Sequence, residues 1–186
     1  LLCMASPLLE MRGIDQRYPG VDALKQVDLT LEAGEVLALM GENGAGKSTL
    51  MKILGGAHRP DDGEIRIAGQ TVTIASPQQA RSLGIAMIYQ EFNLVPGLSA
   101  AENVFLGQEI LKHGVIQHVA QREHTTKLLK ELGMGFDPDT PCQRLTIAQQ
   151  QSVEIARALC LEARILVLDE PSAVLTTREV ERLFAI

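Results

Sequence analysis

The chain has 186 residues, of which 46% are hydrophobic and 22% charged, and its formal net charge is -6. This composition suits one globular domain, or a core with a smaller lobe, and the acidic balance offers no general attraction to nucleic acid or anionic lipid. No apolar run approaches the roughly 20 residues of a membrane-spanning helix. The three cysteines are too far apart for a disulfide framework or a zinc site, so we expect a reducing, cytosolic compartment.

The first part of the chain predicts short strands. Apolar residues alternate over 8–14, 27–31 and 63–67, which is typical of half-buried strands. The apolar run 35–40 predicts one more strand, and it leads through a glycine-rich loop into the helical run 50–54. This order of strand, loop and helix is the context that a phosphate-binding loop requires.

The loop itself, called the phosphate loop below, is Gly41-Glu-Asn-Gly-Ala-Gly-Lys-Ser-Thr49. Its glycines let the backbone approach phosphate closely, and successive N–H groups at the start of a helix form an anion site. Lys47 would add a positive charge, and the Ser48 hydroxyl would bind the magnesium ion that accompanies a nucleoside triphosphate. The predicted nucleotide-binding residues here are Gly41, Asn43, Gly44, Ala45, Gly46, Lys47, Ser48 and Thr49.

The rest of the chain alternates helices with buried strands. The predicted elements are a helix from the Ser76 cap to about residue 83, a strand over 85–89, a helix after the capping box 99–102, helices over 121–132 and 148–161, a strand over 165–168, and a helix starting at the capping box 176–179. Buried strands separated by helices favour a parallel sheet with covered faces, accompanied by antiparallel strands and a helical insertion.

Two carboxylates, Asp169 and Glu170, directly follow the buried strand 165–168. The carboxyl end of such a strand is where open α/β sheets place their ligand chemistry. Together with the phosphate loop, this predicts Asp169 as a magnesium ligand and Glu170 as the residue that orients the attacking water in phosphoryl transfer. A solvated acidic turn is the alternative interpretation of the pair taken alone.

These motifs, with Leu145-Thr-Ile-Ala-Gln-Gln-Gln151 between them, resemble the ATPase subunits of ABC transporters over nearly the whole chain. The resemblance implies an α/β fold, a P-loop NTPase (RecA-like) core with an antiparallel β subdomain and a helical subdomain. It implies a single domain over 4–186, with the core and β subdomain in 4–89 and 162–186 and the helical subdomain in 90–161. It also implies an amino-terminal fragment that stops before the family's γ-phosphate-sensing histidine. The start Leu1-Leu-Cys-Met4 has neither a basic region nor a long apolar region, so we expect the residues before Met4 to be a remnant rather than a signal peptide.

Family members close two ATPase domains head to tail, so that the signature of one domain caps the γ-phosphate bound by the other. The residues of the signature segment that would contact nucleotide are Thr146, Ile147, Ala148 and Gln149. The resemblance further implies that Gln90 contacts magnesium and the attacking water, and that Tyr18 stacks on adenine. Lys47, Gln90 and Glu170 are then the catalytic residues. The alternative interpretation of Tyr18 is an ordinary strand-end tyrosine. Without the flanking match, Gln90 would be interpreted first as a surface amide after a strand.

The signature segment departs from the usual family pattern, because Thr146-Ile147-Ala148 stands where most members have Ser-Gly-Gly. This departure, with the segments 90–96 and 172–176, resembles the importers of the ribose, xylose and galactoside type. The resemblance implies ATP and Mg²⁺ as cofactors, ATP hydrolysis coupled to monosaccharide import, and a position on the cytoplasmic face of the cell membrane. The implied partners are a second ATPase domain, transmembrane permease subunits and, indirectly, a periplasmic or extracellular sugar-binding protein, but no nucleic acid.

Two other functions stay open at this point. One is a nucleotide-binding module without appreciable turnover, which the missing histidine segment suggests. The other is a soluble ABC-type ATPase of translation or DNA repair, against which the acidic charge and the carbohydrate-type segments count. The four histidines, at 58, 113, 118 and 124, form no ligand cluster in the sequence, and we expect solvated or structural roles for them.

Overall fold

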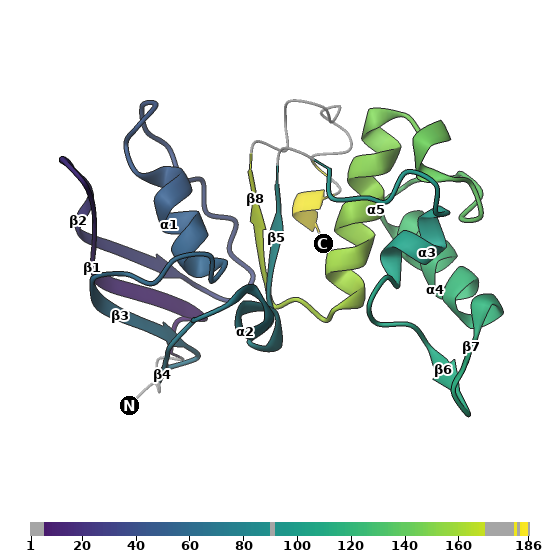
Figure 1. The fold of residues 1–186 in the computed structure, drawn as a ribbon, viewed down its shortest axis with the longest axis horizontal. Helices are drawn as coiled ribbons and strands as arrows, with labels where there is room; N and C mark the ends of the chain where they lie inside the picture. Colours follow the sequence, from purple (N-terminus) through teal and green to yellow (C-terminus); the bar gives the residue numbers. More distant parts are fainter. Residues whose placement is uncertain (1–5, 90–91, 170–180, 182, 186) are drawn as a thin grey trace. The chain divides into compact units, whose positions relative to one another are not determined.

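The computed structural model describes residues 6–89, 92–169, 181 and 183–185. The chain forms two compact units, unit 1 up to Ile85 and unit 2 from Ala86 onward. Unit 1 is built on a four-stranded antiparallel sheet in the order β2-β1-β3-β4 (Figure 1). Its strands are β1 (Leu9–Tyr18), β2 (Val21–Leu31), β3 (Asp62–Ile67) and β4 (Gln70–Val72).

The core of unit 1 follows from the alternation of apolar residues in these strands. Leu9 pairs with Ile67 and Met11 with Ile65 across β1 and β3, and all four side chains are buried. Cross-strand apolar pairs of this kind are the unit of sheet stabilisation, and burying each side chain contributes about 1.5–3 kcal/mol. The strands predicted over 8–14, 27–31 and 63–67 are therefore confirmed.

Two helices complete unit 1. Helix α1 (Lys47–Leu54) contacts β2 and buries Leu50, Ile53 and Leu54. Helix α2 (Pro77–Ser82) begins as predicted, because the Ser76 side chain accepts a hydrogen bond from the backbone N–H of Gln79 at 3.2 Å.

The strand predicted over 35–40 is wrong. This segment has no regular structure, and its apolar side chains are exposed, with Met40 exposed to 88%. A strand exists only where a neighbour pairs its backbone groups, and in unit 1 the four strands of the sheet pair with one another without this segment. The apolar composition was therefore a poor guide, because the partner strand cannot be read from a local window.

Unit 2 combines a strand pair with packed helices. The chain crosses from unit 1 within β5 (Ile85–Ile88), which pairs with β8 (Ile165–Leu168). The N–H of Asp169 donates to the carbonyl of Ile88 at 3.0 Å, so the two strands end side by side, as parallel neighbours do. The helices are α3 (Ala100–Val104), α4 (His118–Glu131) and α5 (Ile147–Cys160), with a 3₁₀ turn over Cys142–Arg144.

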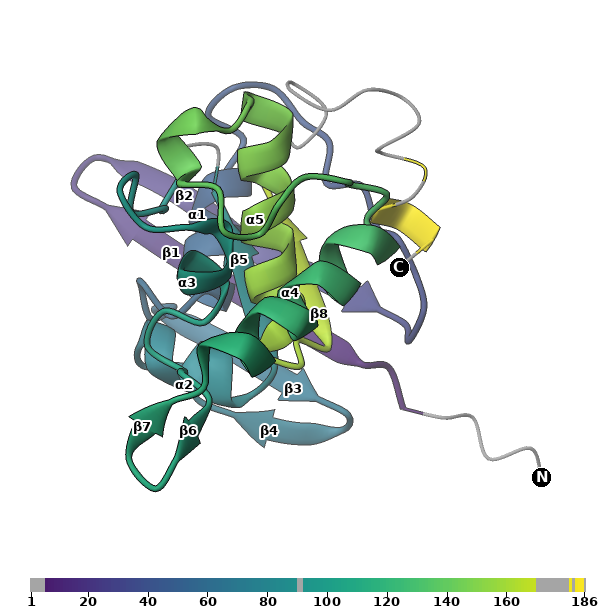
Figure 2. The ribbon, with the colours of Figure 1, turned by 90° about the vertical axis from the view of Figure 1, so that its right-hand side faces the viewer.

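Helices α3, α4 and α5 of unit 2 pack on one another around a common core, and Figure 2 shows α4 crossing beside α5. The fully buried members include Val104 of α3, Leu129 of α4 and Val153 of α5. The capping box of Ser99 and Glu102 at the start of α3 is confirmed, whereas α4 begins at His118 rather than at residue 121. The capping box 176–179, at which the last predicted helix starts, lies outside the described residues, whereas residues 181 and 183–185, which the prediction places in that helix, are helical.

A short hairpin that the sequence pattern did not predict precedes α4. Its strands are β6 (Leu111–Lys112) and β7 (Val115–Ile116). The turn residues His113 and Gly114 have φ of 53° and 80°, and positive φ at both central positions is what a type I′ hairpin turn requires. The hairpin therefore forms on turn chemistry rather than on a long apolar pattern.

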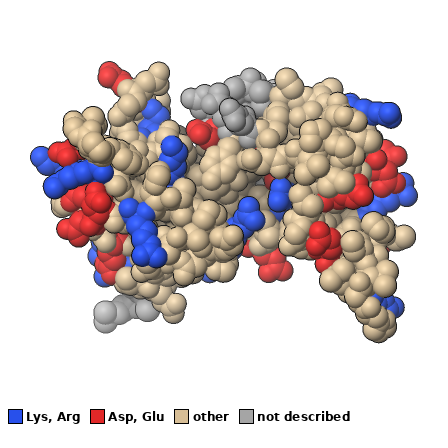
Figure 3. All heavy atoms as spheres, viewed as in Figure 1, with Lys and Arg blue, Asp and Glu red and all other residues tan. Residues whose placement is uncertain are grey.

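Within the described ranges, no helix is both long and apolar enough to cross a membrane. On the face seen in Figure 3, Lys and Arg side chains lie among Asp and Glu rather than in a patch of one sign.

Candidate functional site

The phosphate loop occupies the exposed stretch of unit 1 that leads into α1. Residues 41–45 are exposed, and α1 begins at Lys47 with Gly46 as its N-cap. Gly44 and Gly46 have φ of 86° and 89°, in the left-handed region that favours glycine. The backbone can therefore turn sharply at both positions. Because glycine has no side chain, neither position has a side chain that could cover the N–H groups of the loop.

Gly46 also lies against β2. A Cβ atom at this position would stand 2.5 Å from the carbonyl oxygen of Ala23 and 2.7 Å from Cδ2 of Leu24. No side chain fits there, so the end of the phosphate loop is seated directly on the strand. The carbonyl of Gly46 accepts the N–H of Leu50 at 2.9 Å, which starts the hydrogen bonding of α1 at the same point.

Lys47 folds back over the loop. Its Nζ donates to the carbonyl oxygens of Gly41 at 2.6 Å and of Glu42 at 2.9 Å. The ammonium group thus lies within the curve of the loop, at the amino end of α1, where the helix dipole and free N–H groups also favour an anion. Ser48, the next residue, is exposed. A polyphosphate fits these donors, because its oxygens can replace the two carbonyls as partners of the ammonium group.

Tyr18 lies in the same unit, at the end of β1. It pairs with Val21 across a tight turn, and its side chain is 39% exposed. Its ring meets that of His58 edge to face, with centroids 6.1 Å apart and an interplanar angle of 73°. The hairpin that carries Tyr18 also contains Ala23, against which Gly46 lies. The predicted adenine-stacking residue is therefore part of the same hairpin that the phosphate loop contacts.

The signature segment lies in unit 2, at the start of α5. Thr146 is the N-cap, and its Oγ1 accepts the N–H of Gln149 at 3.3 Å while Oε1 of Gln149 accepts the N–H of Thr146 at 2.9 Å. This reciprocal capping box leaves the N–H groups of Ile147 and Ala148 at the helix end without a protein partner among the described residues. Those two positions are the ones where the usual family pattern has glycine, and the side chain of Ile147 is 56% exposed.

Asp169 follows β8 in unit 2 and is partly buried. The predicted catalytic residues Gln90 and Glu170, and the carbohydrate-type segment 172–176, lie outside the described residues. The residues that the structure describes contain no group of three or more His, Cys, Asp or Glu side chains that could hold a metal ion. Mg²⁺ at a nucleotide usually takes a few side-chain oxygens together with phosphate oxygens. Ser48 in unit 1 and Asp169 in unit 2 each have a side-chain oxygen of this kind.

Two buried polar residues of unit 2 carry no sequence motif. Asn103 of α3 is fully buried, and its Oδ1 accepts the N–H of Val95 at 2.7 Å while Nδ2 donates to the carbonyls of Val95, Leu98 and Ser99 at 3.0, 3.2 and 3.0 Å. Glu154 of α5 is 8% exposed and accepts the N–H of Asn93 at 2.6 Å. The only signal in the sequence was a polar residue at a helix position whose neighbours at helical spacing are buried.

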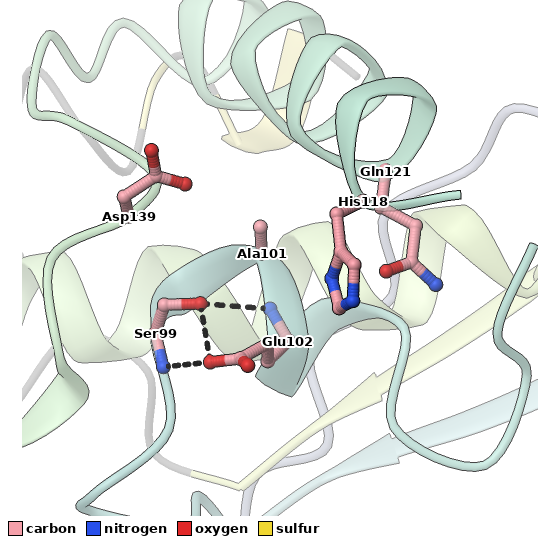
Figure 4. Close-up of a pocket in the computed structure, with 6 residues that line it drawn as sticks. All are labelled: Ser99, Ala101, Glu102, His118, Gln121 and Asp139. Carbon is pink, nitrogen blue, oxygen red and sulfur yellow. Dashed lines mark hydrogen bonds between the residues drawn. The ribbon is translucent and has the colours of Figure 1, made fainter. Parts of the chain in front are cut away.

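A separate hollow of about 250 Å³ lies between the start of α3 and the start of α4. Figure 4 shows its lining residues, Ser99, Ala101, Glu102, His118, Gln121 and Asp139. The hydrogen bonds from the Ser99 N–H and hydroxyl hold the pKa of the Glu102 carboxyl below its ordinary value. This carboxylate already serves the capping box of α3, so the hollow is explained by helix capping.

Comparison with known proteins decides the family. The sequence profile described as ABC transporter matches residues 24–173. The chain belongs to the ABC transporter family. Solved members share its fold: an ATP-binding cassette of an ABC transporter in its ADP conformation aligns with a TM-score of 0.82 and 25% identity, over 96% of this chain and 74% of that chain. The predicted P-loop NTPase core of an ABC cassette is therefore confirmed.

Another solved cassette is described as a dimer in a post-hydrolysis state, bound to ADP and Pi. It aligns with this ABC family member at a TM-score of 0.78 and 28% identity, over 94% of this chain and 79% of that one. Curated relatives include the ribose import ATP-binding protein RbsA 1 of Rubrobacter xylanophilus, 55% identical over 97% of this chain and 36% of the relative. RbsA of Chromobacterium violaceum is 53% identical over 94% of this chain and 35% of its own length. The chain thus spans about a third of the length of these relatives.

Proposed function

We propose that this chain is the ATP-binding and ATP-hydrolysing part of an ABC transporter that imports a monosaccharide, with ribose as the first sugar to test. The phosphate loop carries the proposal. Its left-handed glycines, the seat of Gly46 on β2 and the Lys47 ammonium within the curve of the loop form a cradle for polyphosphate. Family membership and the printed names of the relatives support the transport role.

The roles of individual residues follow from their chemistry. The phosphate loop binds the phosphates of ATP, and the Nζ of Lys47 exchanges the carbonyls of Gly41 and Glu42 for phosphate oxygens. Ser48, Gln90 and Asp169 hold magnesium, which when bound neutralises charge on the phosphates. Glu170 and Gln90 orient the attacking water, since phosphoryl transfer depends mostly on positioning and electrostatics. Tyr18 stacks on the adenine.

The signature segment acts on a second ATPase domain. Thr146, Ile147, Ala148 and Gln149 approach the γ-phosphate bound by that partner domain, where the free N–H groups at the start of α5 favour an anion. The structural likeness to a dimeric cassette supports this arrangement. Permease subunits and, through them, an extracytoplasmic sugar-binding protein complete the transporter, with this chain on the cytoplasmic face of the membrane.

The test uses the purified protein at its full length, with MgATP affinity measured by calorimetry and phosphate release measured alongside. Lys47→Ala should weaken MgATP binding at least about tenfold and abolish release, because it removes the only charged donor seated in the loop. The matched control is Lys52→Ala, an exposed lysine in the last turn of the same helix, which should leave both quantities unchanged.

Three results would argue against the proposal at different levels. Binding without release by the unsubstituted protein would favour a nucleotide-binding module. Absence of binding would remove the phosphate loop from its role. Hydrolysis together with co-purification on ribosomes or DNA, in place of permease subunits, would favour a non-transport ATPase, which the names of the relatives do not support. ATP-dependent ribose uptake by reconstituted vesicles would test the sugar.

A further inference from the structure

The carboxyl group of Glu154 in unit 2 is a buried ionisable group that the proposed mechanism does not use. It lies on α5, is 8% exposed, and its Oε2 has no hydrogen-bond partner among the described residues. Burial raises the pKa of Glu154, although the hydrogen bond from Asn93 and the charge of Arg157 act in the opposite direction. A buried carboxylate with one unpaired oxygen is less favourable than an apolar side chain of similar size would be.

What Glu154 gains is one short hydrogen bond to a backbone segment that has no regular structure. Its Oε1 accepts the N–H of Asn93 at 2.6 Å. Arg157, one helical turn along α5, donates from Nη1 to the carbonyl of the same Asn93 at 3.3 Å. Two charged side chains of one helix therefore hold both backbone polar groups of one residue.

The held segment is fixed at a second point. Asn103 of α3 binds the N–H and carbonyl of Val95, two residues beyond Asn93. The segment from Asn93 to Val95 thus has its backbone polar groups bound by side chains of two helices, α5 and α3, in the same unit. Hydrogen bonds to charged groups are the stronger of these contacts, so the attachment to α5 depends mainly on Glu154.

The contact between Asn93 and Glu154 connects two segments of the chain that each contain a position with a proposed role. Asn93 follows Gln90 by three residues, and α5 begins at Thr146 of the signature segment. We propose that Glu154, assisted by Arg157, is a positioning residue that holds the backbone of Asn93 on α5, so that the segment after Gln90 moves together with the signature helix. This inference rests on the proposed function, because the roles of Gln90 and the signature segment come from it.

The test compares three variants of the full-length protein. Glu154→Leu removes the acceptor, Glu154→Gln keeps an acceptor oxygen in the same shape, and Arg157→Met removes the second contact at a half-buried position that tolerates change better. Ser152→Ala is the control: Ser152 lies on the same helix, is 2% exposed, and loses only its hydrogen bond to the carbonyl of Ala148 at 2.9 Å. Amide hydrogen exchange at Asn93, phosphate release and MgATP affinity are measured for each.

In Glu154→Leu, exchange at Asn93 should accelerate about tenfold or more, and kcat should fall about tenfold while the KM for MgATP changes less than about threefold. Arg157→Met should show the same pattern more weakly, and Glu154→Gln should restore most of both quantities. A merely structural role would lower stability without a selective loss of kcat that Gln rescues.

Unchanged exchange at Asn93 in both Glu154→Leu and Arg157→Met would overturn the inference, as would accelerated exchange with full kcat. If Glu154→Leu does not fold, Arg157→Met decides it, and unchanged exchange at Asn93 or full kcat in that variant would overturn the inference. Failure of the proposed function shows itself differently: the unsubstituted protein would then release no phosphate, whereas the exchange experiment would still report whether Glu154 holds Asn93.

Discussion

Gly46 lies against Ala23 so closely that a Cβ atom at Gly46 would stand 2.5 Å from the Ala23 carbonyl oxygen. Gly46 also has φ of 89°, which L side chains rarely adopt. The end of the phosphate loop is therefore fixed both by its own conformation and by contact with β2, the strand that continues from the turn after Tyr18. In the proposed function, phosphate binding by the loop and the placement of the Tyr18 ring therefore both depend on this one contact.

Gly46→Ala should lower the free energy of unfolding by about 2 kcal/mol or more and weaken MgATP binding, because strain and collision act together. Gly44→Ala separates the two effects: its φ is 86°, but an added Cβ meets no atom within 4 Å, so about 1 kcal/mol is expected. Gly97→Ala, with open space and no positive φ, is the control. Urea denaturation and calorimetry measure the series, and equal effects of Gly44→Ala and Gly46→Ala would contradict the seat.

Thr146 stabilises α5 through its capping box. Thr146→Ala should cost about 1 kcal/mol of unfolding free energy, because the N–H of Gln149 loses its acceptor, whereas Thr146→Ser should cost little. Gln149→Ala should cost a smaller amount through the reciprocal bond to the Thr146 N–H. Urea denaturation checks the order of the three. A Thr146→Ser variant as unstable as Thr146→Ala would mean that the methyl group, not the hydroxyl, matters.

Local chemistry explains what the sequence could predict. The Ser76 cap, the capping box of Ser99 and Glu102, and the phosphate loop each depend on side chains and backbone angles within a few residues. Such short-range rules hold in the folded chain because the unpaired backbone N–H and C=O groups at a helix end are most readily hydrogen-bonded by side chains within a few residues. The predicted helix over 148–161 was placed to within one residue at each end for the same reason.

Tertiary pairing explains what the sequence could not predict. The run 35–40 has the composition of a strand, but strand formation depends on a partner that no local window contains. Asn103 and Glu154 occupy buried helix positions where periodicity predicts apolar residues. The hydrogen bonds of Asn103 with Val95 and of Glu154 with Asn93 are therefore visible only in the folded chain. The seat of Gly46 on Ala23 is likewise a contact between distant residues.

Asn103 should tolerate no carboxylate. Asn103→Asp preserves the shape but replaces the Nδ2 donor by an oxygen that faces the carbonyls of Val95, Leu98 and Ser99. We expect a loss of about 3 kcal/mol or more in unfolding free energy, measured by urea denaturation. Gln143→Glu, the same chemical change at an exposed position within the 3₁₀ turn Cys142–Arg144, should stay within about 0.5 kcal/mol. Equal losses would show that added charge, rather than the lost donor, is responsible.

Cys142 should make stability fall at alkaline pH. Burial raises the pKa of its thiol from 9.0 to about 11, against a smaller opposite effect of the hydrogen bond from Asn103. The folded chain therefore keeps the thiol proton where the unfolded chain has released it, so this contribution is complete below pH 9 and is lost as the pH rises toward 11. Urea denaturation between these values should show a steeper decline for the unsubstituted protein than for Cys142→Ala. Burial also raises the pKa of Cys160, so Cys160→Ala is the comparison and should remove a different part of the decline. If the unfolding free energy of Cys142→Ala fell with pH as steeply as that of the unsubstituted protein, the Cys142 thiol would already be solvated in the folded state.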